Sequence, residues 1–273
     1  MKKRILFNFS LLCAAFLTQR IYCQEIKFGG FMDSFHSGQV FKPDYDVSEN
    51  HGSEGGNLKR KVLDSRTRAH LDLEAWTDNA SMFCSVEASY DAVCESRTAF
   101  CIKEAYIDFG NEWVSLRCGR QIIIWGKADG VQIVDVICPQ DNTTLAGSSI
   151  KDKRIAVDGA LLNLHSQMFS LDLVALPVFT PSKMPVKSDN PLKLIMFPSK
   201  SGNMSLVWND EENVDFTLEN MQGGARISAW LPFADFAASF YTGFDHNAVY
   251  TSKIDGNEIQ MSGEYKRIWM WGL

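Results

Sequence analysis

One stretch of ten residues constrains the fold more than any other part of the chain. From Arg66 to Ala75 the sequence alternates strictly between ionisable residues and small or apolar ones. Successive side chains of a β-strand point to opposite faces, so the alternation predicts a strand with two chemically different faces. One face carries Arg66, Arg68, His70, Asp72 and Glu74, and the other carries Thr67, Ala69, Leu71, Leu73 and Ala75. A row of five ionisable residues requires water along the whole length of the strand.

The same period of two recurs along most of the chain. With the stretch just described it predicts ten strands: Ile26–His36, Arg66–Ala75, Met82–Asp91, the segment around Glu104–Phe109, Val114–Gly119, Arg154–Leu164, Met168–Leu176, Gly223–Leu231, Asp235–Gly243 and Glu258–Leu273. The fold class is therefore expected to be all-β, with neighbouring strands antiparallel.

The connections between these strands alternate in length. Short turns fall at Thr77–Asn79, Gly110–Glu112, His165–Gln167 and Pro232–Ala234, whereas the intervening connections are long or polar: 37–63, 92–98, 122–153, 177–222 and 244–257. Such alternation is typical of a transmembrane β-barrel, which has tight turns on one side and long extracellular loops on the other. Three tryptophans, Trp76, Trp113 and Trp230, fall at strand ends beside short turns, where an interfacial aromatic girdle is expected.

Length and charge agree with a membrane barrel and exclude other classes. Several of the predicted strands have the nine to eleven residues that a tilted strand needs to cross a bilayer. Beyond the N-terminus no apolar run reaches the ~18–20 residues of a spanning helix, so any spanning segment must be a strand. A net charge of −6 argues against a nucleic-acid partner. We expect about ten strands in one barrel, or an incomplete larger barrel.

The N-terminus predicts export. Three basic residues at Lys2–Arg4 precede a short apolar segment, Ile5–Leu17, and Cys23–Glu25 is a plausible cleavage zone. We therefore expect residues 1–23 to be a cleaved signal peptide and residues 24–273 to form the barrel domain. A membrane anchor is disfavoured because the apolar segment is too short, and a lipid-modified cysteine because the bulky Tyr22 stands where a small residue is needed.

The cysteines predict neither a metal site nor a disulfide framework. Five of the seven cysteines follow the signal segment, an odd number, and their spacing matches no zinc site. Cys94 and Cys101 flank one short loop, and a disulfide between them is one interpretation. Cys84 and Cys118 fall on apolar strand faces and are expected to behave as small hydrophobic residues. We expect no cofactor and no metal.

A long polar connection follows the hairpin Glu104–Gly119. It contains Trp125–Gly130 (WGKADG) and ends at Pro139–Asp141, and we expect it to fold back over the barrel mouth or into the lumen. Charged residues at a narrow point determine which solutes pass. The candidate pore-lining residues are Arg66, Arg68, His70, Asp72, Glu74, Glu87, Glu104, Asp108, Arg117, Lys127, Asp129 and Asp135. The alternative is that these charges are solvated, hold turns or only pair with one another.

The same connection resembles a known family. Gly119–Gln121 (GRQ), Trp125–Gly130, Asp135 and Pro139–Asp141 (PQD) are similar to the signature of a large outer-membrane β-barrel family of unknown function, near the alginate-export-type porins. Further similarity lies at Pro177–Pro181 and at Gly224–Arg226, so that the resemblance extends over most of residues 26–273. It implies a barrel in the outer membrane and no established catalytic residues.

Two interpretations of the C-terminal segment stay open. Residues 258–273 are either one long final strand of a ten-stranded barrel or the last part of a truncated chain. The resemblance favours truncation, because members of the family are longer. A truncated chain would leave open sheet edges, which a bilayer does not tolerate.

Enzymatic motifs are missing from the sequence. It has no G-x-S-x-G, no H-E-x-x-H and no phosphate-binding loop, so we expect no enzyme. The expected function is that of an outer-membrane porin-like channel for passive diffusion of small hydrophilic solutes. Its expected partners are outer-membrane lipid, the barrel-assembly machinery and those solutes. A surface-exposed barrel without a channel is the first alternative, and a soluble exported β-protein the second.

Overall fold

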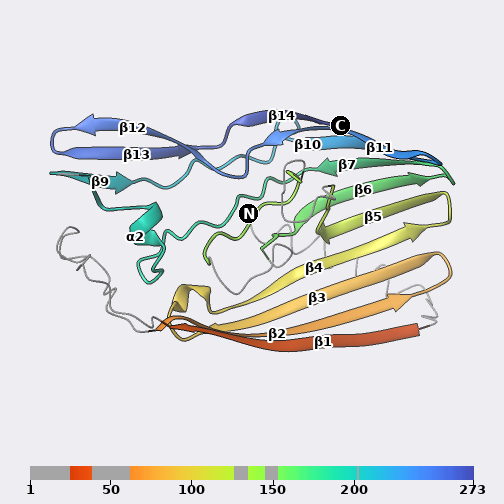
Figure 1. The fold of residues 1–273 in the computed structure, drawn as a ribbon, viewed down its shortest axis with the longest axis horizontal. Coiled ribbons are helices and arrows are strands. Elements are labelled where there is room, and N and C mark those ends of the chain that lie inside the picture. The colour runs from red at the N-terminus through yellow and green to blue at the C-terminus, as the bar shows by residue number, and fades with distance from the viewer. Residues whose placement is uncertain (1–24, 39–61, 126–134, 145–152, 202) are drawn as a thin grey trace.

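The computed structural model describes residues 25–38, 62–125, 135–144, 153–201 and 203–273. Most of these residues form one antiparallel sheet of ten strands (Figure 1). Its strands, in spatial order, are β1 (Glu25–Gly38), β2 (Val62–Trp76), β3 (Ala80–Asp91), β4 (Ala99–Gly110), β5 (Val114–Gln121), β6 (Val157–His165), β7 (Phe169–Leu176), β10 (Gln222–Leu231), β11 (Ala234–Phe244) and β14 (Arg267–Gly272). The predicted all-β fold is confirmed, and this large sheet is antiparallel as predicted.

The cross-strand register keeps the two predicted faces separate over the whole sheet. Leu71 lies opposite Val86, Leu173 opposite Ala225 and Phe240 opposite Trp271, and all of these belong to what we call the outer face. The outer face exposes large apolar side chains on both edge strands and between them: Phe28 is 79% exposed, Leu71 66% and Trp271 76%. The opposite, inner face carries the ionisable residues of β2.

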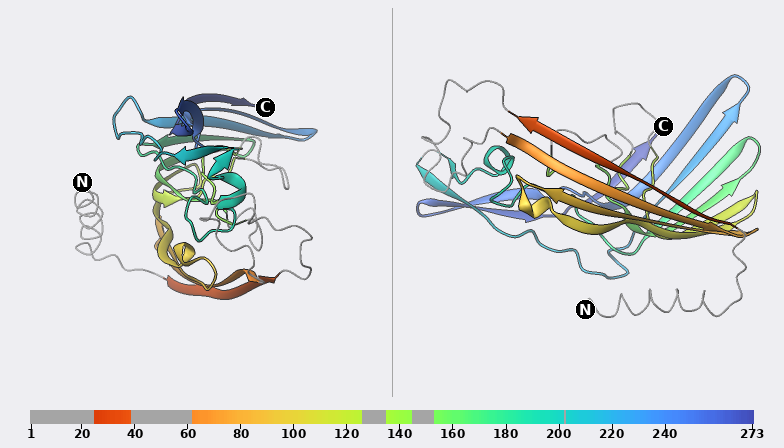
Figure 2. Two further views of the ribbon diagram at one scale, coloured as in Figure 1. Left: turned by 90° about the vertical axis from the view of Figure 1, so that its left-hand side faces the viewer. Right: turned by 90° about the horizontal axis from the view of Figure 1, so that it is seen from below.

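The sheet is strongly curved, and its inner face is concave. In the left view of Figure 2 the strands form an arc, and the green and teal segments that connect β5 to β6 and β7 to β10 lie inside it. Among the described residues no pairing joins β1 to β14, so the sheet is open. The predicted closed barrel is therefore not observed. No helix in the described parts of the chain is long and apolar enough to span a membrane.

A second, smaller sheet was not predicted. It contains β8 (Lys200–Ser201), β9 (Met204–Trp208), β12 (Val249–Asp255) and β13 (Glu258–Glu264) in the order β12-β13-β9-β8. The prediction of one long strand over Glu258–Leu273 is wrong. The strand is interrupted at Tyr265, whose hydroxyl donates a hydrogen bond to Glu211, and β13 pairs with β12 and β9 while β14 pairs with β11.

Two sequence features explain the small sheet. β12 and β13 form a hairpin whose turn contains Gly256, with φ of +59°, a backbone conformation that favours glycine. Ring contacts join Phe197 to Trp208 (centroids 4.8 Å apart) and Trp208 to Tyr250 (5.2 Å). Aromatic pairs of this kind contribute about 0.5–1.5 kcal/mol beyond their buried area. In Figure 1 this sheet extends beyond those ends of the long strands that lie opposite the short turns.

The short elements and the cysteines complete the fold. The helical turns η2 (Glu95–Arg97) and α2 (Lys193–Met196) lie in the connections after β3 and β7. Cys94 and Cys101 are free thiols, so the disulfide considered for them does not form. Cys94 donates to or accepts from the hydroxyl of Ser96, whereas Cys101 lies within β4 opposite Glu87.

Candidate functional site

The inner face of β1 to β4 carries a network of ion pairs. Arg68 is paired with Asp33 of β1, with its Nε 3.0 Å from Oδ1, and its Nη1 lies 3.9 Å from a carboxylate oxygen of Glu87. His70 Nε2 lies 2.8 Å from the same Glu87, and Lys103 Nζ lies 3.7 Å from it. Three cationic or titratable groups therefore meet at the Glu87 carboxylate. These ion pairs compensate the charges of the inner face, which would otherwise be costly to bury beneath another part of the chain.

The network continues across β4 and β5. Arg117 donates two hydrogen bonds to Asp108, at 2.8 and 3.0 Å, and its guanidinium lies 4.3 Å from the ring centroid of Tyr106. Glu104 accepts a hydrogen bond from the backbone N–H of Ile122, at 2.8 Å. Glu104 therefore fixes the point at which the chain leaves β5 and turns onto the inner face.

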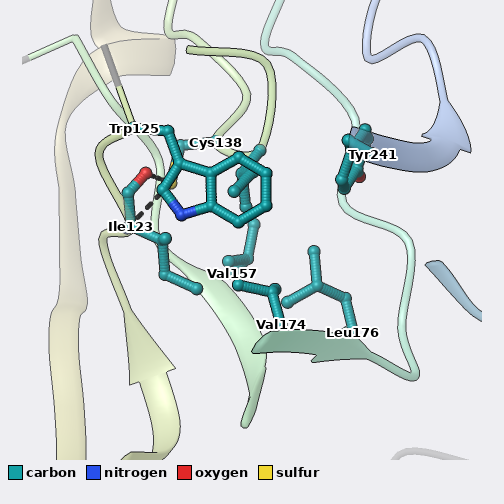
Figure 3. Packing of buried hydrophobic residues seen from close by; sticks show 8 residues of the cluster. Ile123, Trp125, Cys138, Val157, Val174, Leu176 and Tyr241 are labelled. Carbon is teal, nitrogen blue, oxygen red and sulfur yellow. Dashed lines mark hydrogen bonds between the residues drawn. The ribbon is translucent and has the colours of Figure 1, made fainter. Parts of the chain in front are cut away.

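The chain between β5 and β6 packs against this inner face. We call its described parts, residues 122–125, 135–144 and 153–156, the inward connection. Ile123, Trp125, Ile137 and Cys138 of this connection form a buried cluster with inner-face residues of the strands (Figure 3). Those strand residues are Val157 of β6, Val174 and Leu176 of β7, and Tyr241 of β11. This connection was predicted to fold back over a barrel mouth or into a barrel lumen. Its described residues do lie against the inner face of the sheet, but no closed barrel is observed around them.

A buried ion pair holds the two ends of the inward connection together. The Asp135 carboxylate accepts hydrogen bonds from Arg154 and, at 3.4 Å, from the backbone N–H of Trp125. The side chains of Asp135 and Arg154 are 2% and 8% exposed. Backbone pairing adds a second link, because Ile155 donates to Pro139 and Asp141 donates to Lys153. The connection is thus anchored at its centre and not only where it leaves the strands.

His246, after β11, ties the inward connection to the segment that follows β7. Its Nδ1 lies 2.7 Å from the Thr180 carbonyl oxygen, and its Nε2 lies 3.1 Å from the carbonyl oxygens of Val136 and Ile137. Its ring stacks on Phe179. Burial lowers the pKa of His246, while the three carbonyl oxygens and Asp245 act in the opposite direction.

Two further groups show how closely this region is packed. Burial raises the pKa of the Cys138 thiol to about 12, so that it stays protonated. The Tyr250 and Tyr265 hydroxyls both contact the Glu211 carboxylate, and burial together with that contact raises the pKa of both phenols. The raised pKa values keep the thiol and both phenols protonated at neutral pH.

A cavity of about 40 Å³ lies between strands β2 to β4 and the inward connection. Its lining comes from β2, β3 and β4 on one side and from residues 141, 144 and 153 on the other: Arg66, Arg68, Glu87, Lys103, Asp141, Thr144 and Lys153. One buried water needs about 10–15 Å³ of such cavity volume, so this cavity has room for about three waters. It is lined almost entirely by charged side chains.

The structure places most of the predicted pore-lining residues on one face. Arg66, Arg68, His70, Asp72 and Glu74 of β2, Glu87 of β3, Glu104 and Asp108 of β4, and Arg117 of β5 all belong to the inner face. Asp135 lies in the inward connection, where Arg154 neutralises its charge. Lys127 and Asp129 lie outside the described residues, as does the predicted signal peptide.

Sequence reasoning missed Lys103 and the cavity residues of the inward connection. Strict alternation places Lys103 on the face opposite Glu104, but the register between β3 and β4 shifts there: Ser85 pairs with Glu104 and Val86 with Ile102. The extra residue is a β-bulge, which re-aims the side chains around it. The signal was present, since the apolar alternation changes phase between Ile102 and Ala105. Asp141, Thr144 and Lys153 follow no periodic pattern.

Comparisons with known proteins do not assign a role to this site. No protein-family model matches the chain, and no curated protein does. Within the described ranges, no group of three or more His, Cys, Asp or Glu side chains is arranged to hold a metal ion. The site is therefore interpreted from its own geometry.

Proposed function

We propose that this chain forms the wall and the internal constriction of an outer-membrane β-barrel channel through which small hydrophilic solutes diffuse passively. The observation that carries the proposal is the division of one ten-stranded sheet into an exposed apolar outer face and an ion-paired inner face covered by a folded connection. Soluble sheets bury their apolar face and expose their polar one. Here the arrangement is reversed.

The outer face supports a lipid environment. Exposed large apolar residues extend from Phe28 on β1 through Leu71, Phe109, Phe169 and Ile227 to Trp271 on β14. Soluble monomers rarely expose a contiguous apolar patch of more than a few hundred Å². Hydrocarbon, by contrast, accepts such a face, provided that the backbone groups are paired within the sheet.

The inner face supports a narrow, water-filled passage. Arg68, Glu87, Asp108 and Arg117 are balanced by partners, which a charged wall needs beside a confined solute path. The inward connection occupies the middle of the arc and is held there by the Asp135–Arg154 pair and by His246. A fixed internal segment of this kind narrows a barrel without closing it.

The resemblance to the large outer-membrane β-barrel family completes the proposal. It supplies the location in the outer membrane, with bilayer lipid and the barrel-assembly machinery as partners. Within the resembling segment, the geometry gives the motif residues concrete roles. Gln121 is fully buried and donates to the Gly159 carbonyl, Trp125 belongs to the buried cluster, and Asp135 pairs with Arg154.

Fractionation and conductance test the proposal. The exported chain should partition with the outer membrane, stay there after a carbonate wash and show heat-modifiable migration on gels. Reconstituted in planar bilayers, it should give discrete current steps. Recovery in the soluble periplasmic fraction would reject the membrane assignment, whereas stable membrane insertion without current would reject the channel and leave a surface barrel.

The surface-barrel alternative has one observation in its favour. The small sheet extends past the loop ends of the long strands, and its hairpin β12–β13 exposes Ile254 at 69%. An extended, partly apolar hairpin is a suitable surface for contact with another macromolecule. Deleting residues 251–260 would abolish such contact and leave conductance unchanged.

A further inference from the structure

We propose that the small sheet regulates the channel: through a continuous chain of side-chain contacts, with Glu211 as its joint, it holds the inward connection in the constricting position. This inference deepens the proposed function and rests on it, because the inward connection is the constriction of that channel. The contacts run from His246 through Phe179 and Tyr265 to Glu211, and from there to the aromatic residues of the small sheet.

The contacts begin at His246, whose Nε2 lies 3.1 Å from two carbonyl oxygens of the inward connection. Phe179 stacks on the imidazole, with ring centroids 5.6 Å apart, and also packs against the ring of Tyr265 at 4.7 Å. His246 and Tyr265 are each 8% exposed. Packed interiors are stiff and transmit displacements, so movement of Tyr265 acts on His246 and on the carbonyl groups that it contacts.

Glu211 joins the two sheets at the point where the chain passes from one to the other. Tyr265 lies between β13 and β14, and its hydroxyl donates to Oε2 of Glu211. The hydroxyl of Tyr250, on β12, donates to Oε1 at 2.6 Å, so that both carboxylate oxygens are engaged. Hydrogen bonds to an ionised group are about twice as strong as neutral ones. The glycine at position 263 makes room for this joint, because a Cβ there would lie 2.9 Å from Glu211 Cγ and from Tyr250 Cε1.

The far end of the chain of contacts is the aromatic cluster of the small sheet. The ring of Tyr250 contacts Trp208 of β9, and Trp208 contacts Phe197 in turn. The indole N–H of Trp208 donates to the Pro198 carbonyl at 2.9 Å, which fixes the ring in place. Displacement of the small sheet therefore moves the Tyr250 hydroxyl and, with it, Glu211.

Loss of the joint should free the inward connection at His246, while the Asp135–Arg154 pair still holds its centre. The inward connection would then alternate between a held and a released position, and the channel would fluctuate between two current levels. A series of contacts does not by itself measure coupling, and effects at two sites without a shared partner usually add. The decisive observation is therefore whether a change at Glu211 reaches the inward connection through His246.

Four variants isolate the joint. Glu211→Ala removes the carboxylate, and Glu212→Ala is the matched control, because the Glu212 side chain is exposed and its backbone N–H still donates to Gly263. Tyr265→Phe is a milder change that removes one hydroxyl and keeps the ring contact with Phe179. His246→Phe keeps a ring beside Phe179 and removes the hydrogen bonds to the inward connection.

Hydrogen exchange of the full chain in detergent micelles measures the coupling without a channel assay. The amides of Asp141 and Ile155 report on the inward connection, because they donate to Lys153 and Pro139 within it. Glu211→Ala should speed their exchange at least about fivefold, Tyr265→Phe should act in the same direction, and the Glu212→Ala control should have no effect. In the His246→Phe background, Glu211→Ala should add nothing, whereas a general loss of stability would speed exchange equally in both backgrounds.

Single-channel recording in planar bilayers measures the consequence for transport. Glu211→Ala should add a second, larger current level that is rare in the wild type and in the Glu212→Ala control.

The outcomes are distinct. A chain that carries no current, but in which Glu211→Ala speeds exchange only when His246 is present, would keep the coupling and reject the channel. A conducting chain in which neither Glu211→Ala nor Tyr265→Phe changes exchange at Asp141 and Ile155 would overturn the coupling and leave the channel in place. An effect of equal size with and without His246 would overturn it as well.

Discussion

Replacing Leu71 with arginine tests the assignment of the two faces most sharply. Leu71 is 66% exposed on the outer face of β2, and its neighbour Asp72 lies on the inner face. Leu71 lies five residues before Trp76, the last residue of β2 at the short-turn end. At about 3.4 Å per residue and a tilt of about 40°, it lies about 13 Å above that end, close to the middle of an apolar band about 25 Å tall.

The expected magnitude follows from that depth. An arginine on the lipid face costs about 2–4 kcal/mol at the bilayer midplane and much less near its edges. Leu71→Arg should therefore reduce the equilibrium constant for folding in vesicles by about 30- to 900-fold. Asp72→Arg is the matched control, because the same side chain then enters the polar inner face. Ala75→Arg, close to Trp76, should have an intermediate to small effect.

The assay is denaturant unfolding of the chain in phospholipid vesicles, together with heat-modifiable migration as a measure of assembly. The reasoning predicts a large loss for Leu71→Arg and a small one for Asp72→Arg. If the two variants fold equally well, or if Asp72→Arg is the more damaging, the outer face does not contact lipid and the interpretation of the sheet is refuted.

Three further predictions concern the inward connection. Arg154→Ala leaves the buried Asp135 charge unpaired and should lower the free energy of unfolding by about 3–5 kcal/mol. Proteolysis within residues 122–156 should become faster. The control Lys153→Ala should change neither the free energy of unfolding nor the rate of proteolysis. The pKa of His246 is lowered in the folded state, so its burial contributes stability above pH 6.5 that is lost as the pH falls. His246→Phe should abolish this part of the pH dependence of Tm. If the pH profile of Tm is unchanged in the variant, His246 does not stabilise the packing of the inward connection. Cys138, with a pKa of about 12, should resist iodoacetamide at pH 8 until the chain is unfolded, and rapid labelling of the native state would show that the cluster is open.

Alternation explains why most of the large sheet could be predicted. Residues such as Arg66, Arg68 and His70 must share one face of any strand, and their partners Asp33 and Glu87 alternate in the same way on β1 and β3. The short turns fix which strands are neighbours. Both signals are local, so they survive without knowledge of the rest of the chain.

What sequence reasoning missed depends on contacts between distant residues. The small sheet needs β9 to pair with β13 across more than fifty residues, and the pairing is parallel, which no turn signals. The last predicted strand is interrupted at Tyr265, whose hydroxyl donates to the distant Glu211. Asp135 reads as a free carboxylate in a polar loop until Arg154 is placed beside it. Closure of the sheet was predicted from loop lengths, strand lengths, tryptophans at strand ends and a family resemblance, and none of these specifies the pairing of β1 with β14.

Photolabelling from within the bilayer tests the central claim, that the apolar outer face of the ten-stranded sheet lies in lipid. The chain is inserted into vesicles that contain a lipid-soluble diazirine reagent, irradiated and mapped by peptide mass spectrometry. The account predicts modification at outer-face positions such as Phe28, Leu71 and Ile227, and none at inner-face positions such as Arg68, Asp72 and Arg226. Labelling that ignores this alternation, or that falls on the inner face, would contradict it.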